Sequence, residues 1–394
     1  MTDGAEAPRR ERVLFNDVRI QNRRLRDELD AAVRAVIEDG RFELGREVYA
    51  FEEAFAAYCG TRFGVSVHSG TAALHLALRA LGIGAGDEVV TVANSDLSTV
   101  AAVRFAGARP VLVDIDPHSL TMDPAAFLAA ITPRTRAVLP VHMYGRPAEM
   151  EPILEIARAR DLRVIEDAAI AAGATYHGHK VGGLGDAGCF SFAPGKVLGA
   201  FGWGGMITTN DPEVARRARM LRAYGEDPAA YPPPAAGFRF AGLHPEVMGW
   251  NLRMDTLQAA VLLVKLRHLE AMIAERRAIA ARYRERLAGA PVWLPDDPPG
   301  MRHVYRNVVV RVPGRDAVRR VLYEDGIPTG THYIPPTHLT PAFRDLGYAP
   351  GSLPRTEEVA RELLTLPIYP GLPPEDVDLV ADRLRRAVEA LAAG

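Results

Sequence analysis

Short apolar runs alternate with segments of helical periodicity along most of the chain. Between residues 25 and 40, apolar residues recur at the spacing of an amphipathic helix that ends at Gly40: Leu25, Leu29, Val33, Val36 and Ile37. From Phe63 onward, apolar runs predict strands: FGVSV, EVVTVA, PVLVDI, AVLPVHMY, LRVIED, GCFSF and GMITTN. Between these runs, helices are predicted over 71–81, up to Phe105 and over 148–160.

This alternation predicts an α/β fold with a mainly parallel sheet, because parallel neighbours are joined by right-handed crossovers that cover both faces of the sheet. Ligands of such sheets bind at the carboxyl ends of the strands. Side chains that directly follow the predicted strands are therefore the candidates for chemistry.

The pattern changes after Asp211. A helix is predicted over 212–225, and residues 226–248 hold too many Pro and Gly residues for a long element. One long helix over 254–287, a strand over 304–312, a helix over 315–325 and a final helix from 374 indicate a smaller α+β domain. We therefore expect a disordered N-terminus over 1–12, a large domain over 13–253, and the connecting helix with a small domain over 254–394.

Composition and charge exclude several classes of protein. With 394 residues the chain is long enough for two domains, since single cores stop growing near about 250–300 residues. Its 47 basic and 49 acidic residues give no general attraction to nucleic acid or to an anionic membrane. No apolar run reaches the roughly 18 residues of a membrane helix and no signal peptide is recognisable, so we expect a cytoplasmic protein. Cys59 and Cys189 form neither a redox pair nor a metal-ligand cluster.

Three segments at predicted strand ends carry residues suited to chemistry. In HSGTAALHLAL, Gly70 and Thr71 open a helix whose N–H groups can bind an anion, although the same residues suit ordinary capping. Asp167 follows a strand and can hold a cationic ring nitrogen or cap the next helix. Lys196 lies among apolar and small residues five positions after Ser191, which indicates covalent or charge-paired use, although a surface lysine on a turn is the alternative.

A fourth segment, GWNLRMDTLQAAVL, places Asn251 and Arg253 before the long helix. An anion site, an acid and a lysine in this order match the needs of pyridoxal 5'-phosphate (PLP). These needs are an anchor for the phosphate, a partner for the pyridine nitrogen and an amine that forms a Schiff base.

The chain resembles the sugar aminotransferases of the DegT/DnrJ/EryC1/StrS family over nearly its whole length. The resemblance rests on GRFELGREVYAFEEAFAAYCGT, SGTAALHLALRALGIGAGDEVV, ITPRTRAVLPVHMYGRPAEM, VIEDAA, FSFAPGK, GGMITTND, NLRMDTLQAAVL and LTLPIYPGL. It implies fold type I of the PLP-dependent transferases, the fold of aspartate aminotransferase, in a homodimer with shared active sites.

The resemblance also implies roles for individual residues. Lys196 would carry PLP covalently, and its released amine would move the proton between cofactor and substrate; a lowered pKa of a buried lysine suits both tasks. Asp167 would pair with the protonated ring nitrogen. Gly70, Thr71 and Ser191 would hold the phosphate.

Asn251 would reach the phosphate from the partner subunit. His332, Tyr333 and His338, in GTHYIPPTHL, are candidates for substrate contacts, with packing as the alternative.

Three residues depart from the family pattern. Members usually read P-x-x-T-[F/W/Y]-x-A-T-A-N with the aromatic ring stacked on the cofactor, and Asp96 stands at the aromatic position. Ile170 replaces the glutamine or histidine of D-x-A-[Q/H], and Trp203 occupies a place that is usually polar or acidic. Either these contacts have been repacked, with Asp96 as an acid at the start of a helix, or the chemistry is altered.

The resulting hypothesis is a PLP-dependent aminotransferase that installs an amino group on a nucleotide-linked keto-sugar, with glutamate or glutamine as donor and the pyridoxamine form of the cofactor during turnover. Such an enzyme would serve secondary metabolism or surface-glycan synthesis. The alternatives are a PLP enzyme that dehydrates or oxidises a related sugar, and a non-catalytic regulator on the same fold.

Overall fold

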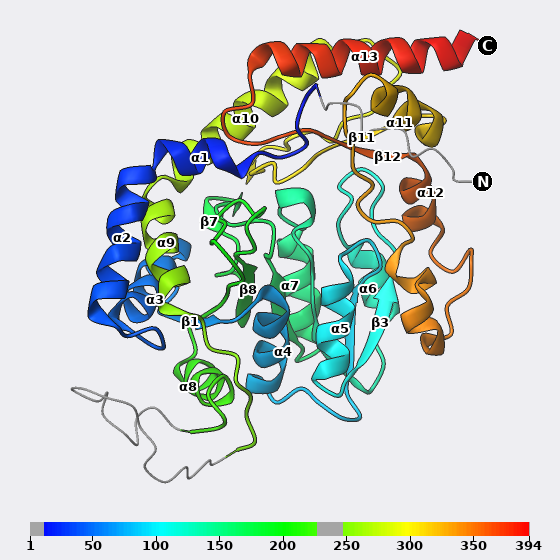
Figure 1. Cartoon of the computed structure of the whole chain (residues 1–394). Helices are drawn as coiled ribbons and strands as arrows, with labels where there is room; N and C mark the ends of the chain where they lie inside the picture. The colour runs from blue at the N-terminus through cyan, green and yellow to red at the C-terminus, as the bar shows by residue number, and fades with distance from the viewer. Residues whose placement is uncertain (1–11, 227–246, 394) are drawn as a thin grey trace, which may run out of the picture.

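A computed structural model describes residues 12–226 and 247–393 (Figure 1). The disorder expected of the first residues, and nearly all of the breaker-rich stretch expected over 226–248, lie outside these residues. No helix of the described part is long and apolar enough to cross a membrane.

A seven-stranded sheet in the order β1-β9-β8-β5-β4-β2-β3 forms the centre of the molecule. Its strands are β1 (Phe63–Val67), β2 (Glu88–Val92), β3 (Arg109–Val113), β4 (Thr135–Val138), β5 (Arg163–Asp167), β8 (Ala187–Ser191) and β9 (Gly205–Thr209). β9 runs antiparallel to both its neighbours, so the other strands share one direction. The predicted, mainly parallel α/β sheet is confirmed. The antiparallel strand follows from the missing helix between β8 and β9.

Helices cover both faces of this sheet. On β8, Cys189 packs into the apolar cluster that contains α4 (Gly70–Ala80), while Phe190 packs into the cluster that contains α3 (Arg46–Cys59). Successive side chains of a strand point to opposite faces, so these two helices lie on opposite sides. The other helices of this region are α1 (Val18–Arg24), α2 (Arg26–Asp39), α5 (Leu97–Phe105), α6 (Pro124–Ala129), α7 (Met150–Ala159) and α8 (Pro212–Leu221).

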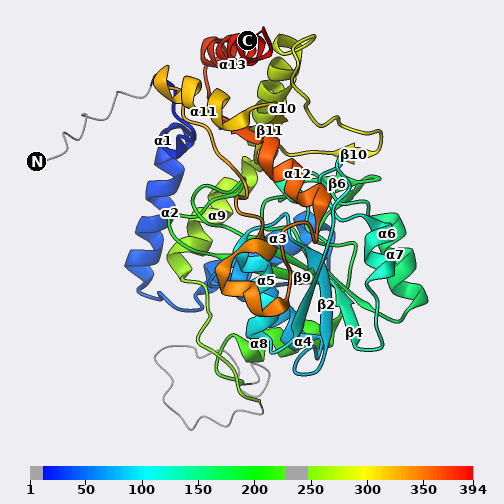
Figure 2. The same ribbon diagram turned by 90° about the vertical axis from the view of Figure 1, so that its right-hand side faces the viewer.

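The C-terminal elements gather above the sheet in both views (Figures 1 and 2). They comprise α10 (Leu269–Arg286), β11 (Val308–Arg311), α11 (Arg315–Glu324), α12 (Pro354–Glu362), β12 (Leu363–Leu366) and α13 (Pro374–Ala393). β11 and β12 form an antiparallel pair, and a second apolar core joins this pair to α10, α11 and α13. A short sheet of β10 (Met301–Arg302), β6 (Thr175–Tyr176) and β7 (His179–Lys180) extends from the main body.

The predicted long helix over 254–287 is wrong as a single element. It is divided into α9 (Thr256–Arg267) and α10, because His268 has φ −103° and ψ 0°, outside helical values. α9 packs on α2 and α3, whereas α10 packs on α13. Val13 belongs to the C-terminal core rather than to the large one. The exact boundaries expected for the two domains stay a prediction.

Candidate active site

Asp167 lies at the carboxyl end of β5 with 3% of its surface exposed. Thr99 of α5 donates its hydroxyl to Asp167 Oδ2 at 2.7 Å, and the backbone N–H of Ala169 donates to Oδ1 at 3.1 Å. Ser95 Oγ lies 2.6 Å from Thr99 Oγ1. Because the single hydroxyl proton of Thr99 goes to the carboxylate, Ser95 is the donor in this second bond. A chain of two hydroxyl groups therefore orients Asp167.

The neighbouring acid, Glu166, points to the other face of the sheet, as the alternation of a strand requires. It accepts the backbone N–H groups of Gly182, Leu184 and Gly185, each at 2.8 Å, and lies 3.0 Å from His142 Nε2. Its hydrogen bonds are thus used inside the protein. Of the two acids that end LRVIED, Asp167 is the one left for chemistry.

Burial raises the pKa of Asp167, and the hydrogen bond from Thr99 lowers it in part. Among residues 12–226 and 247–393, no cationic side chain lies within 4.0 Å of its carboxylate, so it forms no ion pair there. A buried carboxylate without a cation is unfavourable unless a partner arrives. The protonated ring nitrogen of PLP is a group of the required charge.

Lys196 lies on the turn that follows β8, where its N–H donates to Ala193 O at 2.9 Å. Burial lowers the pKa of the Lys196 ammonium, as does the nearby charge of Arg306, while Asp167 and Asp96 raise it. A lysine with a lowered pKa holds its neutral, nucleophilic form at lower pH. The charges of Lys196 and Asp167 therefore act on each other in this fold.

The start of α4 approaches the end of β8 closely. A methyl group on Gly70 would lie 2.6 Å from Ser191 Cβ, and one on Gly205 would lie 2.2 Å from Ser69 O. The Ser69 side chain caps α4 by accepting from Ala72, which leaves the N–H groups of the first turn, Gly70 and Thr71, without a partner inside the helix. N–H groups at a helix start, next to a serine hydroxyl, suit a phosphate.

The described residues thus fit PLP at three points: an amine, a buried carboxylate without a cation, and an anion cradle that glycine alone can form. All three lie at the carboxyl ends of strands β1, β5 and β8.

Comparisons with known proteins agree with this geometry. The DegT/DnrJ/EryC1/StrS aminotransferase family matches residues 23–385. The chain belongs to this family. It is 44% identical to the dTDP-3-amino-3,4,6-trideoxy-alpha-D-glucose transaminase of Streptomyces venezuelae over 390 residues, 99% of each protein.

Solved structures of the family superimpose closely. The crystal structure of S. venezuelae DesV in complex with a ketimine intermediate has a TM-score of 0.91 and 44% identity, and the match covers 96% of this chain and 99% of that one. A Bacillus subtilis structure with bound pyridoxamine phosphate (PMP) has a TM-score of 0.86 and 30% identity, covering 98% and 87%. This chain is accordingly an aminotransferase of fold type I.

The three departures from the family pattern have different structural outcomes. Asp96 is exposed and is the N-cap of α5, where its Oδ1 accepts from Ser98 N at 2.9 Å and from Ser98 Oγ at 2.7 Å. The expected acid at the helix start is present, one position before the first turn. Ile170 is 8% exposed and packs in the large apolar core. Trp203 is 62% exposed in this chain.

The predicted substrate residues separate into two groups. His332 Nδ1 lies 2.9 Å from Thr365 Oγ1, and burial together with Arg306 lowers the pKa of His332 to about 4. Burial raises the pKa of Tyr333, and the charge of Asp96 adds to this effect. Both residues therefore share the electrostatic environment of Lys196.

His338 has different surroundings. It is 1% exposed, and its Nε2 lies 3.1 Å from Glu357, which also accepts backbone N–H groups of Gly351 and Leu353. These are contacts of a packing residue, the alternative that the sequence left open. Asn251 is exposed, and its Oδ1 accepts from Arg253 Nε at 3.1 Å.

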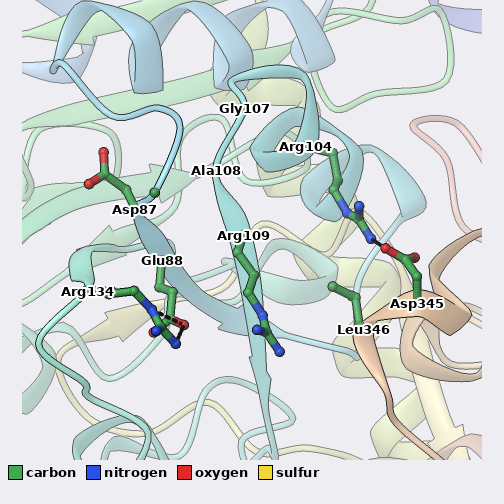
Figure 3. A pocket seen from close by; sticks show the side chains of 10 residues that line it. Asp87, Glu88, Arg104, Gly107, Ala108, Arg109, Arg134, Asp345 and Leu346 are labelled. Carbon is green, nitrogen blue, oxygen red and sulfur yellow. Dashed lines mark hydrogen bonds and ion pairs between the residues drawn. The ribbon is translucent and has the colours of Figure 1, made fainter.

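A polar pocket of about 450 Å³ lies at the opposite end of the sheet, where β2 and β3 begin (Figure 3). Arg134 pairs with Glu88 at 2.7 Å, and Arg104 pairs with Asp345. These pairs neutralise most of the charge that lines it, and ligands of such sheets bind at the other edge. We assign no chemistry to this pocket.

Sequence reasoning missed Thr99 and Arg306. Thr99 could have been found, since the second threonine of the quoted family pattern falls on it. Arg306, in a segment read as a strand, carries no local signal of its position beside Lys196.

Proposed function

We propose that this aminotransferase uses PLP held by Lys196 to place an amino group on a nucleotide-linked keto-sugar, with glutamate or glutamine as donor. The observation that carries the proposal is the buried carboxylate of Asp167 without a cationic partner, in the electrostatic range of Lys196. The sugar class is supported by the name of the S. venezuelae relative and by the extent of the match to it.

When bound, PLP supplies an electron sink for the bonds at the carbon that carries the amino group. The residues of the chain bind the cofactor and move the proton. Asp167 keeps the ring nitrogen protonated, and Thr99 fixes the carboxylate for this contact. The start of α4 and Ser191 hold the phosphate. Burial lowers the pKa of Lys196, which favours the neutral amine that takes and returns the proton during transfer.

The same observations weigh against a non-catalytic regulator. A desolvated lysine and a buried carboxylate without a cation both lower the stability of the fold, and groups of this kind cluster at functional sites. A regulator needs neither an amine for a Schiff base nor a partner for a ring cation.

The proposal is tested with purified protein, PLP, glutamate or glutamine, and a panel of dTDP- and UDP-linked keto-sugars, followed by mass spectrometry of the nucleotide sugars. We expect one amino sugar per keto acid released, and no product with Lys196→Ala. Loss of keto-sugar without an amino sugar, with every donor, would instead favour the dehydrating or oxidising alternative. In that case the variant with Asp96→Phe and Ile170→Gln is the test of whether the departures cause it.

We also propose a homodimer with shared sites, in which Asn251 reaches the phosphate of the partner subunit. Support comes from large apolar side chains that remain exposed around the start of α9: Phe42, Phe201 and Tyr224 are each 48% exposed. The Phe42 carbonyl accepts from Thr256 N, and Phe201 N donates to the Gln258 side chain. Exposed apolar groups gathered at one place are typical of interfaces.

Mixing two inactive variants tests this arrangement. Asn251→Ala and Lys196→Ala chains should together regain part of the activity, because one of the two sites of a heterodimer draws both intact residues from different chains. Heterodimers that form without any recovery would count against a shared site.

A further inference from the structure

Arg306 lies two residues before β11, and its guanidinium lies beside the turn that carries Lys196. A methyl group on Gly195 would lie 3.3 Å from a terminal nitrogen of Arg306 and 3.4 Å from Asn16 Nδ2. Gly195 is the residue before Lys196, so this guanidinium is positioned one residue away from the candidate Schiff-base lysine. A side chain at position 195 would crowd it.

Within residues 12–226 and 247–393, this guanidinium has no anionic partner. Its Nε is buried without a hydrogen bond, and among the described residues no carboxylate lies within 4.0 Å of it. Two arginines on either side in the sequence are paired: Arg302 lies 2.7 Å from Glu270, and Arg311 lies 2.7 Å from Glu358. A buried charge is costly when it has no counter-ion.

The charge of Arg306 is felt by the candidate site. Burial lowers the pKa of Lys196 and of His332, and Arg306 lowers both further. Burial also lowers the pKa of Arg306 itself, as expected of a cation that lacks a counter-ion. The guanidinium is planar and binds carboxylates through two parallel hydrogen bonds, so a ligand with a carboxylate would complete it.

The proposed reaction, on which this inference rests, involves several anions, and the position of the Arg306 charge beside Lys196 indicates which of them it can bind. The cofactor phosphate has its own cradle at Gly70 and Ser191. The diphosphate of a nucleotide sugar is separated from the reacting carbonyl by the sugar ring. The carboxylate of an amino-acid donor, in contrast, is bonded to the carbon that carries the transferred amino group, and it must therefore lie close to Lys196.

We propose that Arg306 binds the α-carboxylate of the amino donor. Arg306 would thus be the residue that lets the same site bind an amino acid as well as a sugar.

The test uses the PLP-loaded enzyme and 2-oxoglutarate, the keto acid that glutamate leaves behind. The two do not react, because neither carries an amino group, so calorimetry reports binding alone. We expect Arg306→Gln to raise the dissociation constant of 2-oxoglutarate by about tenfold or more, as for a lost charge-assisted hydrogen bond. Arg306→Lys should give a smaller rise, since it keeps the charge and loses the fork. Binding of dTDP should not change.

Arg302→Gln is the matched control, because it removes the same charge from a paired arginine outside the site. It should leave the affinity for 2-oxoglutarate unchanged. Unchanged affinity in Arg306→Gln, or weaker binding of dTDP instead, would overturn the proposal. The absorbance of bound PLP is measured in every protein. A wild-type chain that holds no PLP refutes the proposed function, whereas a PLP-loaded Arg306→Gln with unaltered affinity refutes only the role of Arg306.

Discussion

Replacing Thr99 with valine removes one hydroxyl group and leaves the shape of the side chain nearly intact. Thr99 is fully buried, and the hydroxyl donates to Asp167 at 2.7 Å and lies 2.6 Å from Ser95. The bond to the carboxylate is worth about 1.5–3 kcal/mol and the neutral bond about 0.5–1.5 kcal/mol. Because both partners stay buried and unsatisfied, Thr99→Val should lower the free energy of unfolding by about 2–4 kcal/mol.

The same change should weaken the binding of PLP. The hydrogen bond from Thr99 lowers the pKa of Asp167, so its loss lets burial raise that pKa further. At a pH below its pKa, a higher pKa leaves less Asp167 in the ionised form that would pair with the ring nitrogen. We therefore expect the dissociation constant of PLP to rise. The rise should shrink as the pH increases, because Asp167 then ionises in both proteins.

Thr91→Val is the matched control. Thr91 is also fully buried, and its hydroxyl donates at 2.8 Å to the carbonyl of Leu139, not to Asp167. Chemical unfolding followed by fluorescence gives the free energies, and absorbance titration gives the affinities for PLP. The control should lose about 0.5–1.5 kcal/mol of stability and no affinity. Equal affinities of Thr99→Val and wild type, or an equal loss in both variants, would refute the role given to the hydroxyl chain.

Three further outcomes are expected. Lys196→Ala should abolish turnover without lowering the stability of the cofactor-free protein, since it removes a desolvated amine; residual turnover above a mock preparation would be incompatible with its role. Asp96→Ala should cost about 1 kcal/mol in unfolding experiments and Asp96→Asn much less, because asparagine also caps helices; equal losses would contradict the cap. Burial raises the pKa of Glu270, but hydrogen bonds from Tyr58, Lys180 and Arg302 outweigh it and lower the pKa to about 2. The stability from these bonds is present above the unfolded pKa of about 4.3 and is lost as the pH falls toward 2. Acid titration should therefore destabilise the wild type more steeply than Glu270→Gln. Parallel stability curves of the two proteins would exclude this contribution.

The sheet, and the place of the candidate site residues at strand ends, could be predicted because their signals are local. Each strand of the sheet is a short apolar run; Asp167 ends such a run, and Gly70 and Lys196 follow others within a few residues. The carboxyl ends of parallel strands meet at one edge of a sheet, so their order along the chain is enough to bring them together.

The rest depends on contacts between distant segments. The break at His268 carries no Pro or Gly that would mark it in the sequence, and α9 and α10 on its two sides pack against different helices. Arg306 sits 110 positions after Lys196 and becomes a neighbour of its turn only through the tertiary fold.

The central claim is that Lys196 holds PLP opposite Asp167. The direct measurement is borohydride reduction of the PLP-loaded wild-type enzyme, followed by proteolysis and mass spectrometry of every lysine-containing peptide. We expect the mass of the reduced cofactor on the peptide that contains Lys196 and its absence from that peptide in Lys196→Ala. The cofactor on a different lysine of the wild-type chain, or on none, would contradict the account.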